Sequence, residues 1–281
     1  MTLANTVDLV QRAHASKRGV AAFNVITLEH AEAIARGAEL ADQPAILQLS
    51  ENAVAFHGGR LRPLACAVVA VAEESPVPLA VHLDHVEDES LMRQAVGLGI
   101  SSVMYDASKL DYEENLSATR SAAQWAHDQG LWVEAELGEI GGKDGAHAPG
   151  ARTDPDDAFR FVATTSVDGL AVAVGSSHAM VDRTAELDLN LVDALARRLP
   201  VPLVLHGSSG VADDHLAAAV AAGIVKVNVG TILNVAYTRA VREKLAEDAD
   251  VVDPRKYLRP AREAIAAEVS RLSTIISGRR P

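Results

Sequence analysis

The chain has 281 residues, of which 48% are hydrophobic, so it can bury one large core or two small ones. Its 26 lysines and arginines against 38 aspartates and glutamates give a formal net charge of −12, without a basic cluster. This charge argues against nucleic acid and anionic membranes as partners. A phosphorylated substrate is still possible, because a local nest of backbone N–H groups can bind phosphate despite the negative net charge.

The cysteine content and the first residues of the chain indicate in which cellular compartment the protein is expected. Cys66 is the only cysteine, which excludes an intrachain disulfide and fits a reducing compartment. It stands in an apolar run, so we expect a buried structural thiol. We expect no signal peptide between Met1 and His14, and no apolar run approaches the ~18 residues of a membrane span. These features predict a cytoplasmic protein.

Strand-like and helix-like stretches alternate along the chain. In chain order, the predicted strand–helix pairs are 20–25 with 28–41, 44–49 with 61–74, 78–83 with 88–98, 100–105 with 111–128, 131–137 with 154–164, 168–174 with 190–199, 201–205 with 213–222, and 224–229 with a helical tail. Eight such units in about 250 residues predict an α/β protein, a (β/α)₈ TIM barrel. The alternative, a doubly wound open sheet, is disfavoured because no Gly-x-Gly-x-x-Gly fingerprint follows the first strand.

No linker divides the chain, so residues 1–281 are predicted to form a single domain. The loop from Gly138 to Thr153 contains five glycines, which suits an active-site lid; the alternative is an ordinary surface loop. A C-terminal helix over 261–276 is extra to the barrel and could support oligomerisation.

Polar residues follow nearly every predicted strand. They are Asn24, Ser50, Asp84 with His85, Asp106, Glu136, His178, His206 and Asn228. In a TIM barrel the carboxyl ends of the strands meet at one rim, which carries the active site. Polar groups at all eight ends therefore predict an enzyme with its site there.

Three of these rim residues suit a metal. His85, His178 and His206 come from three strands, and three imidazoles with an open fourth position are typical of catalytic zinc. Asp84 beside such an ion is placed to move a proton. His82 shares a strand face with Asp84 and is expected to be a hydrogen-bonded core histidine, with His85 at the strand exit.

Glycine-containing loops follow the last two strands. Gly207, Ser208 and Ser209 form one, and Gly230 with Thr231 the other. Loops after strands seven and eight are the usual phosphate site of a TIM barrel, although Gly-Ser-Ser-Gly alone could be an ordinary turn.

Several ordered segments together resemble one family. They are Ala22-Phe23-Asn24-Val25, His82-Leu83-Asp84-His85, Glu134-Ala135-Glu136-Leu137-Gly138 with Gly141-Gly142, His178, Leu205-His206-Gly207-Ser208-Ser209, Lys226-Val227-Asn228-Val229 and Asp253-Pro254-Arg255-Lys256. The chain thereby resembles the class II, zinc-dependent ketose-bisphosphate aldolases, which include the fructose- and tagatose-bisphosphate enzymes.

The resemblance implies roles for the metal and the acids. His85, His178 and His206 would bind Zn²⁺, with Glu136 and Asp106 forming an alternative or second metal position. Asp84 would exchange a proton with the C4 hydroxyl of the ketose. Three histidines also accept Co²⁺ or Mn²⁺, and a monovalent cation is a further candidate cofactor. Asp144 would be the acid of the glycine-rich loop, where the family usually has glutamate.

The resemblance also implies substrate contacts. Gly207, Ser208, Ser209, Asn228, Gly230 and Thr231 would surround one phosphate, and Asn24 and Ser50 would touch the three-carbon donor. Arg255 would reach the distal phosphate in a neighbouring subunit, so a homodimer or homotetramer is expected.

Three positions depart from the family pattern. Ala179 replaces the glycine after the second zinc histidine, and Asp182 stands where a lysine-like donor is common, with Arg183 beside it. A carboxylate cannot donate to phosphate, so either the pocket is altered or Arg183 takes over. Gly230 replaces the residue that distinguishes fructose from tagatose configurations. The substrate could therefore be another phosphorylated or unphosphorylated keto-sugar.

Two other classes remain open. A metal-dependent hydrolase can use the same barrel, but such barrels commonly carry His-x-His on the first strand, where this chain has Asn24. A binding or regulatory protein with a relic site is the other, and failure to bind zinc would indicate it.

Overall fold

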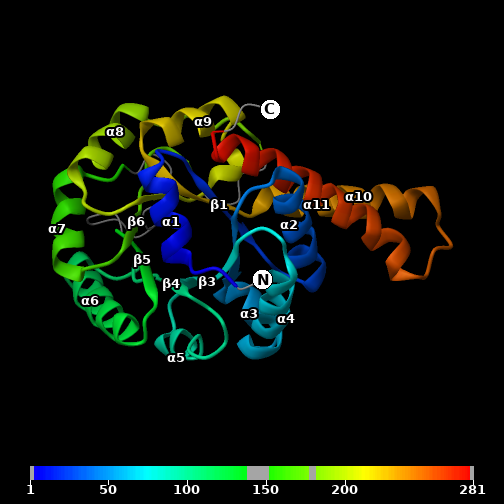
Figure 1. Cartoon of the computed structure of the whole chain (residues 1–281), viewed down its shortest axis with the longest axis horizontal. Coiled ribbons are helices and arrows are strands. Elements are labelled where there is room, and N and C mark those ends of the chain that lie inside the picture. Colours follow the sequence, from blue (N-terminus) through cyan, green and yellow to red (C-terminus); the bar gives the residue numbers. More distant parts are fainter. Residues whose placement is uncertain (1–2, 138–151, 177–181, 279–281) are drawn as a thin grey trace.

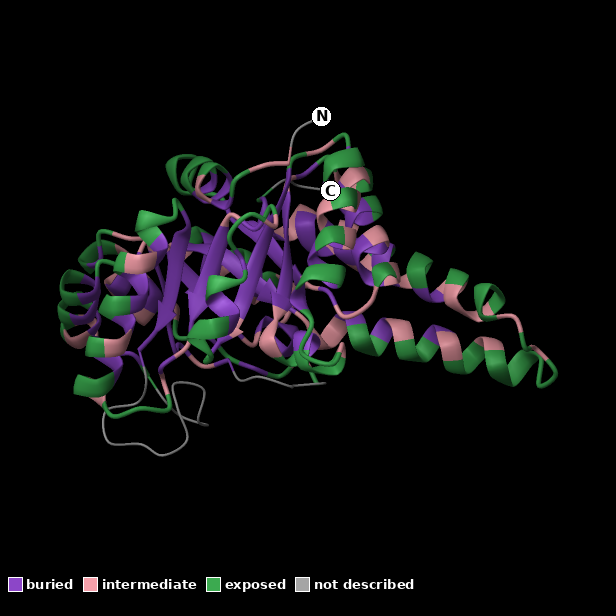
Figure 2. Ribbon diagram, turned by 90° about the horizontal axis from the view of Figure 1, so that it is seen from below, coloured by how far each residue is buried: buried purple, intermediate pink, exposed green. Residues whose placement is uncertain are grey.

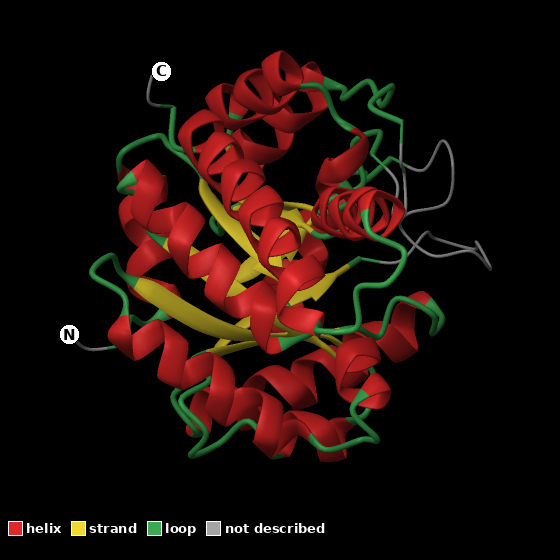
Figure 3. Cartoon of the chain, turned by 90° about the vertical axis from the view of Figure 1, so that its right-hand side faces the viewer, coloured by secondary structure: helices red, strands yellow, loops and turns green. Residues whose placement is uncertain are grey.

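A computed structural model of the chain describes residues 3–137, 152–176 and 182–278. Eight parallel strands close into a barrel in sequence order, ringed by helices, which confirms the predicted TIM barrel (Figure 1, Figure 3). The strands are β1 Val20–Asn24, β2 Ala45–Ser50, β3 Leu79–Val86, β4 Ser102–Tyr105, β5 Trp132–Glu136, β6 Gly169–Ala171, β7 Leu203–Leu205 and β8 Ile224–Val229. Their near-continuous apolar runs reflect burial on both faces.

The helices largely follow the predicted order. They are α1 Thr6–Ala15, α2 Leu28–Ala41, α3 Glu51–Phe56, α4 Leu61–Glu74, α5 Glu89–Arg93, α6 Tyr112–Asp128, α7 Pro155–Thr165, α8 Leu189–Arg198, the short 3₁₀ turn η1 Ser208–Gly210, α9 Asp213–Ala222, α10 Thr231–Glu247 and α11 Pro254–Ile276. The prediction missed α1 and α3, and it made α5 too long. In the described part of the chain, no helix is both long and apolar enough to cross a membrane.

Helix α1 closes the amino-terminal end of the barrel. Leu9, Val10 and Ala13 pack on an apolar layer that includes Ile46 and Trp132 of the strands. In Figure 1 this helix lies across the end of the barrel that faces the viewer. The barrel is therefore a packed core at this end.

Polarity changes with height inside the barrel. Along β2, β3 and β5, every second residue shares a face, so Ala80, His82 and Asp84 follow one another upward. The lowest of these residues belongs to the apolar layer, His82 is buried, and Asp84 reaches the carboxyl-terminal rim. By the same alternation along β5, Trp132 lies in the apolar layer, Glu134 one level above it, and Glu136 at the rim.

Helix α11 packs on the outside of the barrel, against the other helices. It begins at Pro254, earlier than the predicted start at 261, and its buried face includes Ile265, Val269 and Leu272. It packs against α2 at Gly37, where an added Cβ would lie 2.5 Å from the Cβ of Val269. The close approach of the two helices thus requires glycine at this position.

The outer parts of α10 and α11 project from the barrel as a hairpin (Figure 1, Figure 2). None of residues 241–260 is buried. Val252, near the tip, has 89% of its surface exposed. We call residues 241–260 the arm.

The environment of the single cysteine differs from the prediction. Cys66 is exposed on α4, whereas a buried thiol was expected. The buried face of this helix is formed by Leu61, Leu64, Ala65 and Val68. Cys66 falls outside this stripe, so the apolar character of its neighbours in sequence did not report its burial.

Gly37→Ala should destabilise the protein. Helix propensity alone would favour alanine by about 1 kcal/mol. The overlap with Val269 should outweigh it, with a net loss of about 1–3 kcal/mol in the free energy of unfolding. Urea denaturation of both proteins measures this loss. A stabilised variant would show that α11 is only loosely docked on α2.

Candidate active site

A cavity of about 500 Å³ opens at the carboxyl-terminal rim of the barrel. Its lining includes Asn24, Ile26, Ser50, Glu51, Asn52, Asp84, His85, Glu87, Asp106, Gly207, Ser208, Ser209, Asn228, Gly230, Thr231 and Asn234. Most of the residues predicted from the strand ends thus meet around one space. Among the described residues that line it, none is a lysine or arginine.

A local irregularity in β3 brings two consecutive residues to the cavity. In a regular strand, Asp84 and His85 would point to opposite faces. His85 instead has a positive φ of 48°, and the pairing with β4 shifts register between Leu83 and Val86. A non-glycine residue in this conformation is strained, which is common at functional sites. His85 was expected at the strand exit, but it lies within β3.

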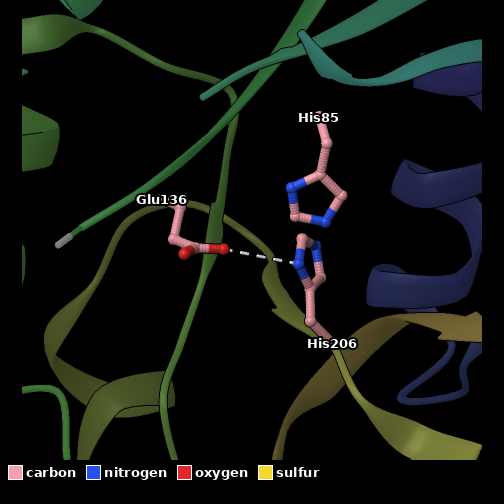
Figure 4. A group of neighbouring side chains, drawn as sticks. All are labelled: His85, Glu136 and His206. Carbon is pink, nitrogen blue, oxygen red and sulfur yellow. Dashed lines mark ion pairs between the residues drawn. The ribbon is translucent and has the colours of Figure 1, made fainter. Parts of the chain in front are cut away.

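Three side chains converge beside the cavity in an arrangement suited to a metal. His85, Glu136 and His206 each offer a ligand atom, and these atoms lie within 4.8 Å of one another. Figure 4 shows the two imidazoles facing each other, with the Glu136 carboxylate at their side. Nδ1 of His206 lies 3.4 Å from Oε2 of Glu136.

Asp106 orients His85. Its Oδ2 lies 2.8 Å from Nδ1 of His85, while its Oδ1 accepts hydrogen bonds from the backbone N–H and hydroxyl of Ser108. Burial disfavours the charged imidazole of His85, but Asp84, Asp106 and Glu136 outweigh it and raise its pKa to about 10. The same carboxylates would favour a bound dication. The metal role predicted for Asp106 stays a prediction.

Glu134 orients His206 from below. Its Oε1 lies 2.8 Å from Nε2 of His206, and its Oε2 accepts a hydrogen bond from the Lys226 ammonium at 2.8 Å. All three side chains are fully buried. Burial alone would raise the pKa of Glu134, but Lys226 and His206 outweigh it and hold the pKa below its ordinary value. Burial lowers the pKa of His206, and Glu134 and Glu136 more than reverse this effect.

Asp84 is held by two amides. Asn228 approaches its Oδ1 at 3.4 Å, and Asn24 approaches its Oδ2 at 3.5 Å. Burial raises the pKa of Asp84, but His85, Lys226 and the other histidines outweigh it, so the pKa lies below its ordinary value. Asp84 is therefore an ionised carboxylate, able to accept a proton.

His82 is a neutral core residue, as its sequence context indicated. Its Nδ1 lies 2.7 Å from the hydroxyl of Ser102. Burial, and then Lys226, lower its pKa to about 3. Its Nε2 has no hydrogen-bond partner among the residues described, and lies 3.8 Å from Oδ1 of Asp84.

The loops after β7 and β8 meet at the cavity and contribute to its lining. Gly207 has a positive φ of 65° and leads into the turn η1. The Ser208 hydroxyl donates to the backbone carbonyl of Asn228, and the Ser209 hydroxyl accepts from the backbone N–H of Ile232 at 3.1 Å. These bonds fix the two loops together and place the start of α10 beside the turn.

Two predicted contacts lie away from this cavity. Arg183 donates to the backbone carbonyl of Val211 and forms an ion pair with Asp213, and it is not among the residues lining the cavity. Arg255 lies on the arm, where it pairs with Asp253 and its side chain is 85% exposed. Asp144, His178 and Ala179 lie outside the described residues, as does most of the predicted lid.

Sequence reasoning assigned no role to the residues beneath the rim. Glu134 and Lys226 were noted only as parts of matching segments, and Gln48, which donates to Asn24 at 3.2 Å, was not considered. A lysine in the middle of the apolar run Ile224–Val229 was the available signal, because charged side chains are rarely buried without a partner.

His82 should make the metal-free protein sensitive to acid. Its folded-state pKa of about 3 lies below its ordinary value of 6.5, so its contribution to stability is complete above 6.5 and is lost as the pH falls toward 3. Between pH 7 and pH 5, wild type should lose about 2 kcal/mol more than His82→Gln, measured by urea denaturation. His14→Gln, at an exposed position, should behave as wild type. Equal losses in wild type and His82→Gln would contradict the neutral assignment.

Comparisons with known proteins agree with this geometry. The family model for class II fructose-bisphosphate aldolase matches residues 4–278. The fructose-bisphosphate aldolase of Thermus caldophilus is 37% identical over 290 residues, covering 94% of each chain. The 6-phospho-5-dehydro-2-deoxy-D-gluconate aldolase of Bacillus subtilis is 34% identical over 272 residues, covering 96% of this chain and 93% of the other.

A solved structure supports the same assignment. The crystal structure of the YdjI aldolase from Escherichia coli K12 superposes with a TM-score of 0.85 at 30% identity, covering 99% of this chain and 98% of the other. The rim carboxylates and histidines therefore belong to an enzyme that makes or breaks carbon–carbon bonds. The chain is a member of the class II fructose-bisphosphate aldolase family and is an aldehyde-lyase.

Proposed function

We propose that the protein is a metal-dependent aldolase that cleaves a ketose phosphate between C3 and C4 and catalyses the reverse condensation. The products would be dihydroxyacetone phosphate and an aldehyde, as part of carbohydrate metabolism. The observation that carries the proposal is the cluster of His85, Glu136 and His206 directly beside the ionised Asp84.

Zinc is the proposed metal, with cobalt or manganese as substitutes. Two imidazole nitrogens and a carboxylate oxygen in reach of one another fit a divalent ion of this kind, and neighbouring carboxylates favour a cation there. His178 would add a third imidazole. When bound, the metal would supply Lewis-acid stabilisation of the negative charge that develops on the donor fragment.

Asp84 is proposed to move the proton at the C4 hydroxyl. Bond cleavage turns this hydroxyl into the carbonyl of the leaving aldehyde, so its proton must be accepted as the C3–C4 electrons move to the donor fragment. Asp84 is ionised and held by Asn24 and Asn228, which leaves it in the state required of a base. In the condensation direction it returns the proton. Asp144 remains the proposed acid for the donor carbon.

The donor phosphate is proposed to bind where η1 meets the start of α10. Backbone N–H groups at helix starts bind phosphate without a cationic side chain, which fits a lining that includes Gly207, Ser209 and Thr231. Arg183 is engaged with Asp213, so we do not assign it to this phosphate. Asn24 and Ser50 line the cavity near Asp84 and would contact the donor.

Fructose 1,6-bisphosphate, or a tagatose-type isomer, is the proposed substrate. The names of the relatives support two kinds of phosphorylated keto-compound, a fructose bisphosphate and the keto-acid 6-phospho-5-dehydro-2-deoxy-D-gluconate. At Gly230, an added Cβ would lie 3.3 Å from Oδ1 of Asn24. Gly230 therefore leaves space beside the Asn24 amide, which is proposed to contact the donor. A substrate with either hydroxyl configuration, fructose-like or tagatose-like, would fit there.

A homodimer or homotetramer is proposed to complete the site. The arm has no buried residue in the described chain and carries exposed Leu245 and Val252, so a neighbouring subunit would cover it. Arg255 stands near its tip and would supply the distal phosphate with the cation that the described lining lacks.

Chelator-stripped protein should not release triose phosphate from fructose 1,6-bisphosphate, and added Zn²⁺ should restore release in a coupled assay. Asp84→Ala should keep zinc but lower kcat by about 10²–10⁴-fold, because only the proton transfer is lost. Zinc content measured by mass spectrometry is the control for folding and loading. Unchanged turnover of Asp84→Ala would contradict the proposed base. Stoichiometric zinc without cleavage would redirect the search to tagatose-type, inositol-derived or unphosphorylated ketoses.

Arg255→Ala should raise KM for the bisphosphate about tenfold or more with a smaller effect on kcat, because one charged hydrogen bond to the distal phosphate is lost. Arg259→Ala, another exposed position on the same helix, is the matched control. Sedimentation velocity should show the same oligomer in all three proteins. A KM equal to that of wild type would exclude Arg255 from the neighbouring site.

A further inference from the structure

Lys226 is buried in the barrel interior directly beneath the candidate site. Its side chain has no exposed surface. The ammonium donates to Oε2 of Glu134 at 2.8 Å and to Oδ1 of Asn228 at 2.7 Å. A lysine ammonium offers only donors, so both of these partners must present acceptors.

The first contact determines how His206 is held. With Oε2 of Glu134 facing Lys226, the other oxygen, Oε1, accepts a hydrogen bond from Nε2 of His206 at 2.8 Å. The proton of the neutral ring is thereby placed on Nε2. Nδ1 is then the nitrogen on the side of Glu136, at 3.4 Å from its Oε2. A carboxylate behind an imidazole is the usual arrangement that fixes ligand tautomer and direction.

The second contact determines which way the Asn228 amide points. Because Oδ1 faces Lys226, the amide nitrogen Nδ2 must face the other way, and it is this nitrogen that approaches Oδ1 of Asp84 at 3.4 Å. The reversed amide would place its NH₂ against the ammonium and its carbonyl against the carboxylate. Lys226 excludes that orientation.

We propose that Lys226 is a positioning residue that orients two parts of the site at once: the metal-facing nitrogen of His206, through Glu134, and the donor of Asn228 that holds Asp84. This inference rests on the proposed metal-dependent function. Lys226 hydrogen-bonds to Glu134 and Asn228, and it orients His206 and Asp84 through these two partners.

A purely structural counter-ion would behave differently. Removing one partner of a buried ion pair leaves an uncompensated charge and destabilises the fold strongly, whereas replacing both charges can be nearly neutral. If Lys226 only neutralised Glu134, then adding Lys226→Met to Glu134→Gln would restore the fold and would cost no further cobalt affinity or kcat beyond what Glu134→Gln itself loses at His206. If Lys226 positions the site, this neutral pair should restore the fold alone.

The test compares wild type, Lys226→Met, Glu134→Gln and the neutral pair Glu134→Gln/Lys226→Met. Thr165→Val is the matched control, because it removes a buried hydrogen bond to the backbone carbonyl of Phe161 on α7, and neither residue lines the cavity. Thermal denaturation of metal-free protein reports the fold. Titration with Co²⁺, followed by visible absorption, reports metal affinity and coordination without any reaction. Cleavage of fructose 1,6-bisphosphate by the zinc-loaded proteins gives kcat and KM separately.

We expect the neutral pair to melt near wild type and to bind Co²⁺ about 10–100-fold more weakly than wild type, with an altered spectrum. Its kcat should fall below that of Glu134→Gln, with a smaller effect on KM, because the Asn228 amide that holds Asp84 is no longer oriented. Thr165→Val should keep the wild-type spectrum. A neutral pair that matches Glu134→Gln or wild type in cobalt affinity and kcat would overturn the positioning role and leave the aldolase proposal intact. Should Lys226→Met fail to fold, the neutral pair still decides. A wild type that binds no cobalt would overturn the metal-dependent function and this inference with it.

Discussion

The closure of eight parallel strands into one barrel is the constraint on which the site depends. All strands run the same way, so their carboxyl ends meet at a single rim, and the period of two along each strand sends every second side chain inward. Along β5 this periodicity places Trp132, Glu134 and Glu136 at the closed end, the middle and the rim. Residues far apart in sequence, such as His85 and His206 with ring centroids 4.8 Å apart, become neighbours only because the barrel closes.

Charge balance inside the barrel follows from the same geometry. Inward-facing carboxylates at two levels would be costly in an apolar interior without partners. Glu134 is matched by Lys226 in the middle level, and the rim carboxylates surround His85 and His206. The rim thus carries an excess of negative charge that a divalent ion would balance, while the middle level is already neutral. This division explains why the metal-suited cluster forms at the rim and not one level lower.

Much of the fold could be predicted because each strand–helix unit has a clear local pattern. Alternation predicted the barrel, and α2, α4, α9 and β8 have the predicted bounds. The cavity-lining residues at strand ends followed from the topology. The positive φ of His85 and the ion pair of Arg183 with Asp213 could not be predicted, since each depends on contacts between distant segments. The prediction of a buried Cys66 was wrong because it rested on the apolar neighbours in sequence, whereas Cys66 lies outside the buried stripe of α4. The orienting role of Glu134 likewise needs the register that brings it to His206.

The position of helix α1 determines by which end of the barrel reactants enter and leave. By filling the amino-terminal end of the barrel with Leu9, Val10 and Ala13, it leaves the rim as the route between Asp84 and solvent in the described part of the chain. An aldolase produces two fragments from one molecule, and here both would leave through the opening at the carboxyl-terminal rim. Cleavage and condensation therefore share one path, because the fragments that leave after the first reaction must enter for the second by the same opening.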